Sequence, residues 1–377
     1  MDEGVSRRRF LQSVAVGNAA AVVGCMGDDG NTTTSDDGSG RDGPDPERER
    51  VEWTFETGGE VESTPTVADG TVYITSEDRR LYALDTASDA AQWTFETRAP
   101  SRPVNGTRTG PAVGDGAVYF QTLPGDGNVY AVDADTGAQL WQAGVGGSTS
   151  VPVLADGRLY FGSLDGNVYA LAPDTGEELW RYESSGIVSG TPRVVDGTVY
   201  VAIRDDHLYA LDAETGEAVW RVDVGATPTA RPAVADGAVY MANGDVYAVD
   251  ADTGDQQWRF GGGSGDEFHA SPVVADGTVY ASGPEEARLT ALDADSGERV
   301  WDGLFAQSPP AVVGDTLFVV AKASVRALDP SDGSERWSVE TPIESDGYAV
   351  NRGGPAVVGD TLYAGSVNGT VYAISID

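Results

Sequence analysis

The sequence of 377 residues is poor in cysteine, histidine and lysine. It contains one cysteine, Cys25, two histidines, His207 and His269, and one lysine, Lys322. A single cysteine excludes an internal disulfide and a metal centre made of several cysteines. The two histidines lack the close spacing of a zinc motif, so a structural role is favoured for each over a role as general base or metal ligand. The chain must therefore be stabilised mainly by packing.

The sequence also lacks an apolar run long enough to span a bilayer, since the stretch over residues 11–23 is short and interrupted by polar side chains. This stretch follows Arg7 and Arg8, and the two features together resemble a twin-arginine export signal. It leads into Cys25 in a sequence similar to a lipobox, in which the peptide is cleaved before a cysteine that is then lipidated. We therefore expect residues 1–25 to be a lipoprotein signal peptide. The alternative is an ordinary signal or short anchor in which Cys25 is incidental.

Residues 26–50 contain few apolar side chains and read as an acidic, disordered tether. The whole chain carries a net charge of −36. This charge argues against a nucleic-acid partner, which needs a basic face, and against a specific site for acidic substrates. Scarce lysine and abundant Asp and Glu resemble the proteins of extreme halophiles, in which molar salt screens the repulsion between like charges.

A repeat of the form Ala-x5-Gly-x3-Trp fills the rest of the chain. Complete copies end at six of the eight tryptophans: Trp141, Trp180, Trp220, Trp258, Trp301 and Trp337. A further copy, from Ala83 to Trp93, has Asp89 in place of the glycine. The last copy begins at Val371 and lacks its tryptophan, which stands instead near the other end of the chain as Trp53. A period of about 40 residues with this offset predicts a β-propeller whose first strand completes the last blade.

Each repeat contains a proline, a short β-rich run, a turn that is Asp-Gly in most repeats and a second β-rich run, followed by the Trp repeat. This order predicts four antiparallel strands per blade, which we name A to D from the proline to the tryptophan. The fold class is therefore all-β, an eight-bladed propeller over residues 51–377. The tryptophans and tyrosines recur once per unit, so packing between blades is favoured over a ligand-stacking role.

The predicted topology places the A–B and C–D turns on one rim and the B–C loops and inter-blade connectors on the other. The turns are uniform whereas the connectors vary, so recognition is expected on the connector side. Five arginines gather in one sector of that side: Arg79, Arg80, Arg98, Arg102 and Arg108. They are candidates for binding a carboxylate-rich partner or an anionic head group, and the alternative is that neighbouring acids neutralise them.

Three aromatic residues on the same side do not fit the repeat, namely Phe268, Phe305 and Tyr348. Phe268 and Tyr348 are candidates for exposed contacts with a partner, because aromatic residues beside arginine are typical of interface hot spots. The alternative is that such rings pack the connectors onto the ring, and this reading is preferred for Phe305. The acids of the B–C loops, among them Asp126, Asp165 and the pair Asp205–Asp206, are read as turn formers rather than cation ligands.

The Ala-x5-Gly-x3-Trp repeat resembles the tryptophan-docking repeat of quinoprotein dehydrogenases, which bind pyrroloquinoline quinone (PQQ) with calcium. Those enzymes carry an adjacent cysteine pair against the cofactor, which this sequence cannot have, and their calcium and catalytic residues match no motif here. In length, lipobox and short loops the chain is more similar to BamB-like propeller lipoproteins, which in bacteria are scaffolds of outer-membrane assembly. No catalytic, cofactor-binding or metal-ligating residues are therefore assigned.

The sequence thus favours a non-enzymatic lipoprotein on the outer face of the cytoplasmic membrane. The resemblance implies an envelope or membrane protein as partner, and it disfavours a small-molecule ligand. The rival interpretation is a PQQ-dependent dehydrogenase or another quinoprotein-like oxidoreductase. A structural component of the cell coat is the third possibility.

Overall fold

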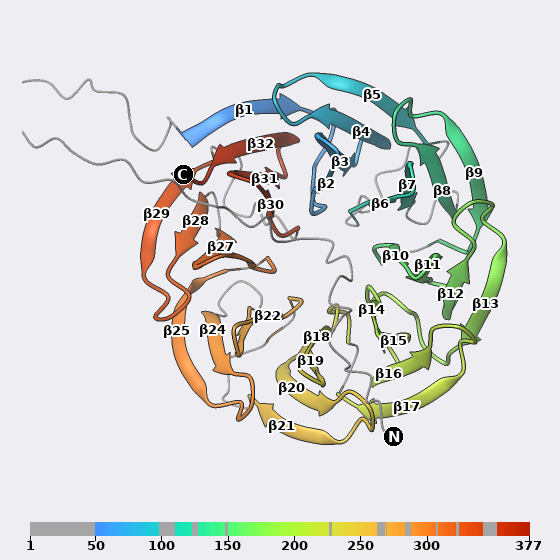
Figure 1. Ribbon diagram of the computed structural model, residues 1–377, viewed down its shortest axis with the longest axis vertical. Helices are drawn as coiled ribbons and strands as arrows, with labels where there is room; N and C mark the ends of the chain where they lie inside the picture. Colours follow the sequence, from blue (N-terminus) through green and yellow to red (C-terminus); the bar gives the residue numbers. More distant parts are fainter. Residues whose placement is uncertain are drawn as a thin grey trace, which may run out of the picture.

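The chain forms a ring of eight four-stranded antiparallel sheets, shown along its axis in Figure 1. This confirms the predicted eight-bladed propeller. The structure is a computed structural model that describes residues 50–97, 110–122, 127–147, 150–225, 228–261, 268, 270–282, 288–306, 308–321, 324–341 and 353–377. Within these residues no helix is long and apolar enough to cross a membrane.

The innermost and outermost strands of each blade differ in length and exposure. The A strands, three residues each, form the innermost layer: β2 (Thr66–Ala68), β6 (Ala112–Gly114), β10 (Val153–Ala155), β14 (Arg193–Val195), β18 (Ala233–Ala235), β22 (Val273–Ala275), β26 (Ala311–Val313) and β30 (Ala356–Val358). The D strands form the outer wall: β5 (Ala91–Glu96), β9 (Gln139–Gly144), β13 (Glu178–Glu183), β17 (Ala218–Asp223), β21 (Gln256–Phe260), β25 (Arg299–Phe305), β29 (Glu335–Glu340) and β1 (Val51–Glu56).

The two middle strands of each blade form its buried centre. The B strands are β3 (Thr71–Ser76), β7 (Ala117–Gln121), β11 (Arg158–Gly162), β15 (Thr198–Ile203), β19 (Ala238–Asn243), β23 (Thr278–Ala281), β27 (Thr316–Ala321) and β31 (Thr361–Gly365). The C strands are β4 (Arg80–Asp85), β8 (Asn128–Asp133), β12 (Asn167–Leu171), β16 (His207–Asp212), β20 (Asp245–Asp250), β24 (Arg288–Asp293), β28 (Ser324–Leu328) and β32 (Thr370–Ser375).

The ring is closed by its two ends, as the displaced tryptophan predicts. The last blade has the strand order β1-β32-β31-β30, so the first strand of the chain supplies the outer strand beside the last one. Trp53 of β1 pairs with Ala373 of β32, the register that the other tryptophans keep with the alanine of their own repeat. Closure therefore uses hydrogen bonds of the ordinary blade pattern.

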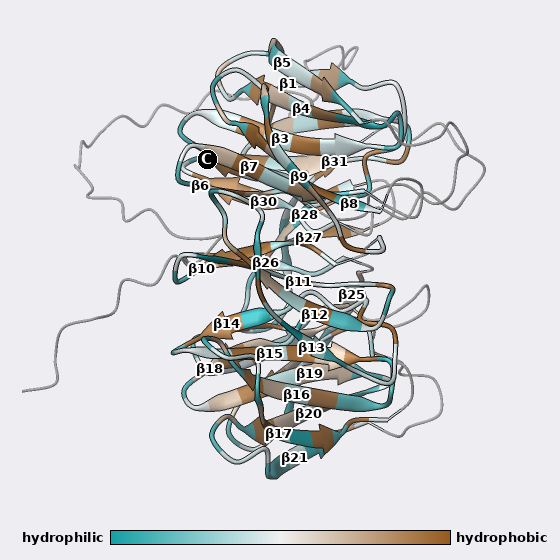
Figure 2. Cartoon of the chain, turned by 90° about the vertical axis from the view of Figure 1, so that its right-hand side faces the viewer, coloured by the Kyte–Doolittle hydropathy of each residue, from teal (hydrophilic) through white to brown (hydrophobic). Residues whose placement is uncertain are grey.

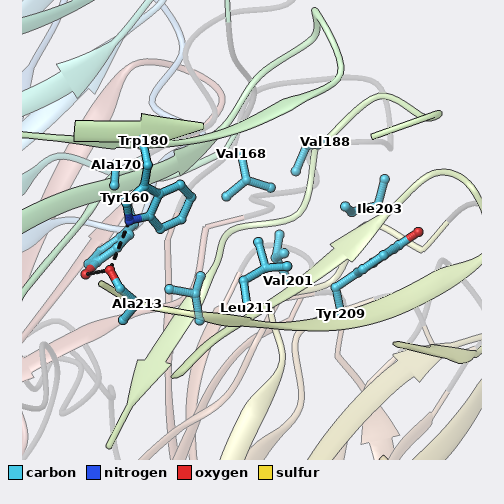
Figure 3. Close-up of a cluster of buried hydrophobic side chains, with 11 residues drawn as sticks. Tyr160, Val168, Ala170, Trp180, Val188, Val201, Ile203, Tyr209, Leu211 and Ala213 are labelled. Atoms are coloured by element: carbon cyan, nitrogen blue, oxygen red, sulfur yellow. Dashed lines mark hydrogen bonds between the residues drawn. The ribbon is translucent and has the colours of Figure 1, made fainter. Parts of the chain in front are cut away.

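The hydrophobic core is divided into layers between neighbouring blades. In the layer between the third and fourth blades, Val168 and Trp180 of one blade pack against Val201 and Leu211 of the next (Figure 3). Both faces of a blade meet such a layer, so B and C strands are buried along nearly their whole length. Figure 2 shows the consequence from the side: hydrophobic residues lie mainly along the strands and hydrophilic ones at the turns.

One rim of the ring, here called the turn rim, consists of the A–B and C–D turns. In six blades the aspartate of the A–B turn has a positive φ, as at Asp196 with φ 48°, and the glycine after it has one too. Two such residues in succession suit the tight turn that the Asp-Gly pairs predict. The C–D turn lies alongside, because the Ala213 amide donates to the Gly197 carbonyl over 2.9 Å.

The tryptophan of each regular blade docks onto the C–D turn of the next blade. The Nε1–H of Trp180 donates to the Ala213 carbonyl over 3.0 Å, and the hydroxyl of Tyr160 donates to the same carbonyl, also over 3.0 Å (Figure 3). Gly216 lies under the indole, where an added Cβ would come within 2.6 Å of Trp180 Cε3. The repeat therefore encodes a recurring contact between blades, here called the joint: the glycine makes room for the indole ring, and the turn carbonyl accepts the N–H of the tryptophan.

The joint changes where the chain ends meet. Trp337 faces the last blade, whose C and D strands come from opposite ends of the chain and so have no turn between them. The Arg50 guanidinium stacks on the Trp337 ring, 4.5 Å from its centroid, and Arg50 Nη1 donates to the main-chain oxygen of Asp377 over 2.6 Å. An arginine thus occupies the place of the missing turn and ties both ends to the neighbouring blade.

Candidate functional site

The opposite rim, here called the connector rim, consists of the B–C loops and the segments that join one blade to the next. The connector between the third and fourth blades is fixed by backbone hydrogen bonds to the loops of both blades. The Val188 amide donates to the Ser163 carbonyl of the third blade, and the Arg204 amide of the fourth blade donates to the Ile187 carbonyl, both over 3.0 Å. Ile187 keeps 40% of its surface exposed between these anchors. The rim therefore presents connector side chains on a rigid frame.

Acids of the B–C loops serve as hydrogen-bond acceptors for tyrosines of the C strands. The Tyr169 hydroxyl donates to Asp165 Oδ2 over 2.7 Å, and the Tyr209 hydroxyl donates to Asp205 Oδ2 over 2.8 Å. Burial, followed by this hydrogen bond to Asp205, raises the pKa of Tyr209 to about 12. These aspartates hold the loops against the strands, which agrees with reading them as turn formers.

Arg79 and Arg80 have acidic neighbours within their own blade. Arg79 Nη2 lies 3.2 Å from Glu96 Oε1, and Arg80 Nη2 lies 3.7 Å from Glu96 Oε2. Arg80 Nη1 is also 3.8 Å from Asp78, whose carboxylate accepts the Tyr82 hydroxyl. All three charged groups at Glu96 remain substantially exposed, so the pairs are weak and screened. The two arginines can therefore still exchange these partners for another anion.

The other members of the predicted sector are not all described. Arg98, Arg102 and Arg108 lie outside the described residues, and so do Tyr348 and the side chain of Phe305. Whether the five arginines form one patch therefore stays a prediction.

Phe268 corrects the expectation of an exposed aromatic contact, because only 1% of its surface is exposed. Its backbone exchanges hydrogen bonds of 2.9 and 3.1 Å with Gly244, and its ring centroid lies 6.1 Å from that of Phe260. The residue stands four positions before a proline, as do Val61 and Val188, which are fully buried. Phe268 thus packs its connector onto the ring, the alternative that the sequence left open.

His207 lies at the start of β16 and is half-buried. Its Nδ1 is 2.6 Å from the Asp205 carbonyl and 3.6 Å from Asp205 Oδ1. His269 lies outside the described residues. In the described part of the chain, no three His, Cys, Asp or Glu side chains gather in a group that could hold a metal ion.

Two features of the arginine distribution escaped the sequence analysis. In three consecutive blades an arginine directly follows the repeat tryptophan and lies opposite a C-strand tyrosine; these are Arg181, Arg221 and Arg259. Arg193 and Arg231 flank the prolines of the fourth and fifth blades, at columns that otherwise hold uncharged residues. Aligning the repeats column by column would have revealed both, because the signal is a break in a repeat rather than a motif.

Comparison with known proteins places the chain in a family. Residues 29–126, 125–244 and 242–377 match the family described as outer membrane protein assembly factor BamB. The chain belongs to this family of PQQ-repeat β-propellers. Among individual proteins, BamB of Yersinia pestis is 33% identical over 124 residues, which cover 29% of this chain and 30% of that protein. The 1-butanol dehydrogenase (cytochrome c) of Thauera butanivorans is 28% identical over 159 residues, 37% of this chain and 23% of that one.

Solved structures share the architecture. BamB from Moraxella catarrhalis superposes with a TM-score of 0.70 at 18% identity, covering 86% of this chain and 99% of that chain. Quinohemoprotein alcohol dehydrogenase from Comamonas testosteroni gives 0.69 at 17% identity, covering 86% and 76%. The sequence matches span less than a third of the length of the curated relatives. The comparisons therefore establish the propeller and its family, with both an outer membrane protein assembly factor and dehydrogenases among its relatives.

Proposed function

We propose that this protein is a non-enzymatic, lipid-anchored propeller on the outer face of the cytoplasmic membrane. There it binds an envelope protein through the connector rim. Lipidated Cys25 is the anchor, and the acidic tether spaces the ring from the bilayer.

The observation that carries the proposal is the extent of the structural likeness. The ring corresponds to 99% of the solved BamB chain, so it is a propeller of the same outline. The family match runs over almost the whole sequence and carries the same description. The turn rim repeats one joint from blade to blade, whereas the sequences of the connectors vary, and surfaces that vary on a rigid frame are where propellers place recognition.

The test is affinity capture of the tagged protein from gently solubilised membranes in molar salt. We expect a stoichiometric envelope protein with the wild type, and reduced capture after replacing Arg98, Arg102 and Arg108 with serine. A matched control replaces Arg299 and Arg336, which lie beside the turn rim. Unchanged capture by the triple variant, at unchanged thermal stability, would remove the arginine sector from the proposal.

The anchor is tested separately by Cys25→Ser. The substituted protein is expected in the soluble fraction after cell lysis, whereas the wild type sediments with membranes. A protein that stays with the membrane after this substitution has another anchor.

A second candidate is a quinoprotein-like oxidoreductase, favoured by the sequence identity to quinoprotein alcohol dehydrogenases, for example 34% over 97 residues with the ethanol dehydrogenase of Pseudomonas aeruginosa. It predicts quinone absorbance bound to the protein after addition of PQQ and calcium, together with dye-linked oxidation of alcohols. Saturable PQQ binding with turnover would replace the scaffold proposal, and silence in both assays would remove the enzyme.

A further inference from the structure

The A strands line the axis of the ring and contact one another around it (Figure 1). The positions just before and just after each blade's proline therefore lie at the inner edge. Fourteen of these sixteen positions are uncharged in the sequence, and the two exceptions are Arg231, before Pro232, and Arg193, after Pro192. They belong to neighbouring blades, so two positive charges stand side by side at the centre of a strongly acidic protein.

Neither guanidinium group has a hydrogen bond or an ion pair with any residue that the structure describes. The Nε atoms of both are shielded from solvent. Burial lowers the pKa of Arg193, and burial together with the nearby charge of Arg193 lowers the pKa of Arg231 to about 10. Two desolvated like charges destabilise each other unless an anion joins them.

Arg158 is also partly buried, and it shows that an arginine in this protein can be buried to this degree and still have an acidic neighbour. Its Nε is also shielded from solvent and without a hydrogen bond. Its charge, however, has an acidic neighbour: hydrogen bonds from Thr215 lower the pKa of Asp212, and the charge of Arg158 lowers it further. At the inner pair no carboxylate contributes to the pKa of either arginine: the causes are burial and, for Arg231, the charge of Arg193.

Two hydroxyl groups adjoin the pair and have protons to donate. Thr191 Oγ1 accepts the Val151 amide over 2.9 Å, and Ser271 Oγ accepts the Arg231 amide over 2.9 Å. An oxygen that accepts in this way still carries its own hydrogen. Thr191 stands two residues before Arg193, and Ser271 stands next to Arg231 in the ring. The inner edge of the fourth to sixth blades is therefore rich in donors.

We propose that Arg193 and Arg231, aided by Thr191 and Ser271, bind a small dicarboxylate at the inner edge of the ring. A dianion matches two cations one blade apart, with one carboxylate for each guanidinium. The unpartnered Nε and the adjacent Nη form the donor fork that a carboxylate accepts in bidentate fashion. The strongly negative charge of the whole chain does not exclude this site, because molar salt screens distant charges and leaves contacts within a few ångströms effective.

The test is calorimetric titration of the full-length protein with malonate in molar KCl, at constant ionic strength and without added calcium. We expect one site per chain, and about tenfold or greater weakening in Arg193→Gln and in Arg231→Gln, since each loses a bidentate charged contact. Arg158→Gln is the matched control and should bind like the wild type. Without malonate, Arg231→Gln should melt no lower than the wild type, because it removes a like-charge contact.

Two other outcomes would contradict the proposed site. No binding to the wild type, or equal weakening by Arg158→Gln, overturns the proposal. The chain's own acidic tether is the competing occupant, so a full-length variant with Asp28, Asp29, Asp36 and Asp37 replaced by asparagine is titrated in parallel. Malonate binding that appears only in this variant assigns the site to the tether and not to a free dicarboxylate.

Discussion

On the turn rim, one joint recurs around the ring: a tryptophan, a glycine beneath it and a carbonyl that accepts its N–H. On the connector rim, a tyrosine donates a hydrogen bond to an aspartate in the third and fourth blades, whereas an arginine pairs with an aspartate in the fifth. The repeated residues of the turn rim hold neighbouring blades together. That rigidity leaves the connector rim free to change from blade to blade without loss of the fold.

The largest expected effect comes from breaking one turn-rim joint. Trp180→Ala removes a buried ring and its hydrogen bond to Ala213, so the free energy of unfolding should fall by roughly 3–5 kcal/mol. Denaturant unfolding in molar KCl measures it. Leu179→Ala, the exposed neighbour in the same strand, is the control and should change stability by about 0.5 kcal/mol or less. Equal losses in the two variants would contradict the docking role.

A second substitution separates the joint from the backbone of the turn. Gly216→Ala and Gly197→Ala both place alanine at a φ of 75°, and each should cost about 1–2 kcal/mol for that reason. Only Gly216 faces an indole, because an added Cβ at Gly197 meets nothing within 4 Å. Overpacking should add about 1–3 kcal/mol at Gly216 alone. Equal costs in the two unfolding curves would mean that the glycine serves the turn and not the tryptophan.

Alkaline pH tests one tyrosine from each rim. Burial raises the pKa of Tyr160 to about 12, and burial with the hydrogen bond to Asp205 does the same for Tyr209. A raised pKa means that the folded state holds the proton more tightly. The stabilisation is complete below pH 10 and is lost as the pH rises towards 12, at about 1.4 kcal/mol for each unit of pKa shift.

The measurement is the free energy of unfolding between pH 9 and about pH 12. Tyr160→Phe and Tyr209→Phe should each flatten this decline relative to the wild type. If only one of them does, the two rims differ in how well they shield their tyrosines from solvent. Unchanged slopes in both would show that other groups govern alkaline unfolding.

The same contrast explains what could be predicted from the sequence. The blade count, the closure by Trp53 and the two rims follow from columns that repeat, since the same packing problem is solved in each blade. Many connector residues, in contrast, make contacts that occur in one blade and do not recur in the others. The aromatic side chain of Phe268 departs from the repeat, which predicts an exposed contact, but its place four residues before a proline is the one that buried Val61 and Val188 occupy. No motif contains Arg193 or Arg231, and their proximity depends on two blades lying side by side, so the sequence pattern alone does not predict the pair.

The smallest effect on stability is expected on the connector rim. Arg79→Asn combined with Arg80→Ser removes exposed ion pairs with Glu96 and Asp78, and asparagine tolerates the φ of 73° at position 79. The free energy of unfolding should change by less than about 1 kcal/mol. If this sector docks an acidic partner, capture from membranes should nevertheless fall, whereas Arg299→Ser near the turn rim should leave it intact. Loss of stability without loss of capture would reverse the roles assigned to the two rims, because the connector rim would then hold the ring rather than the partner.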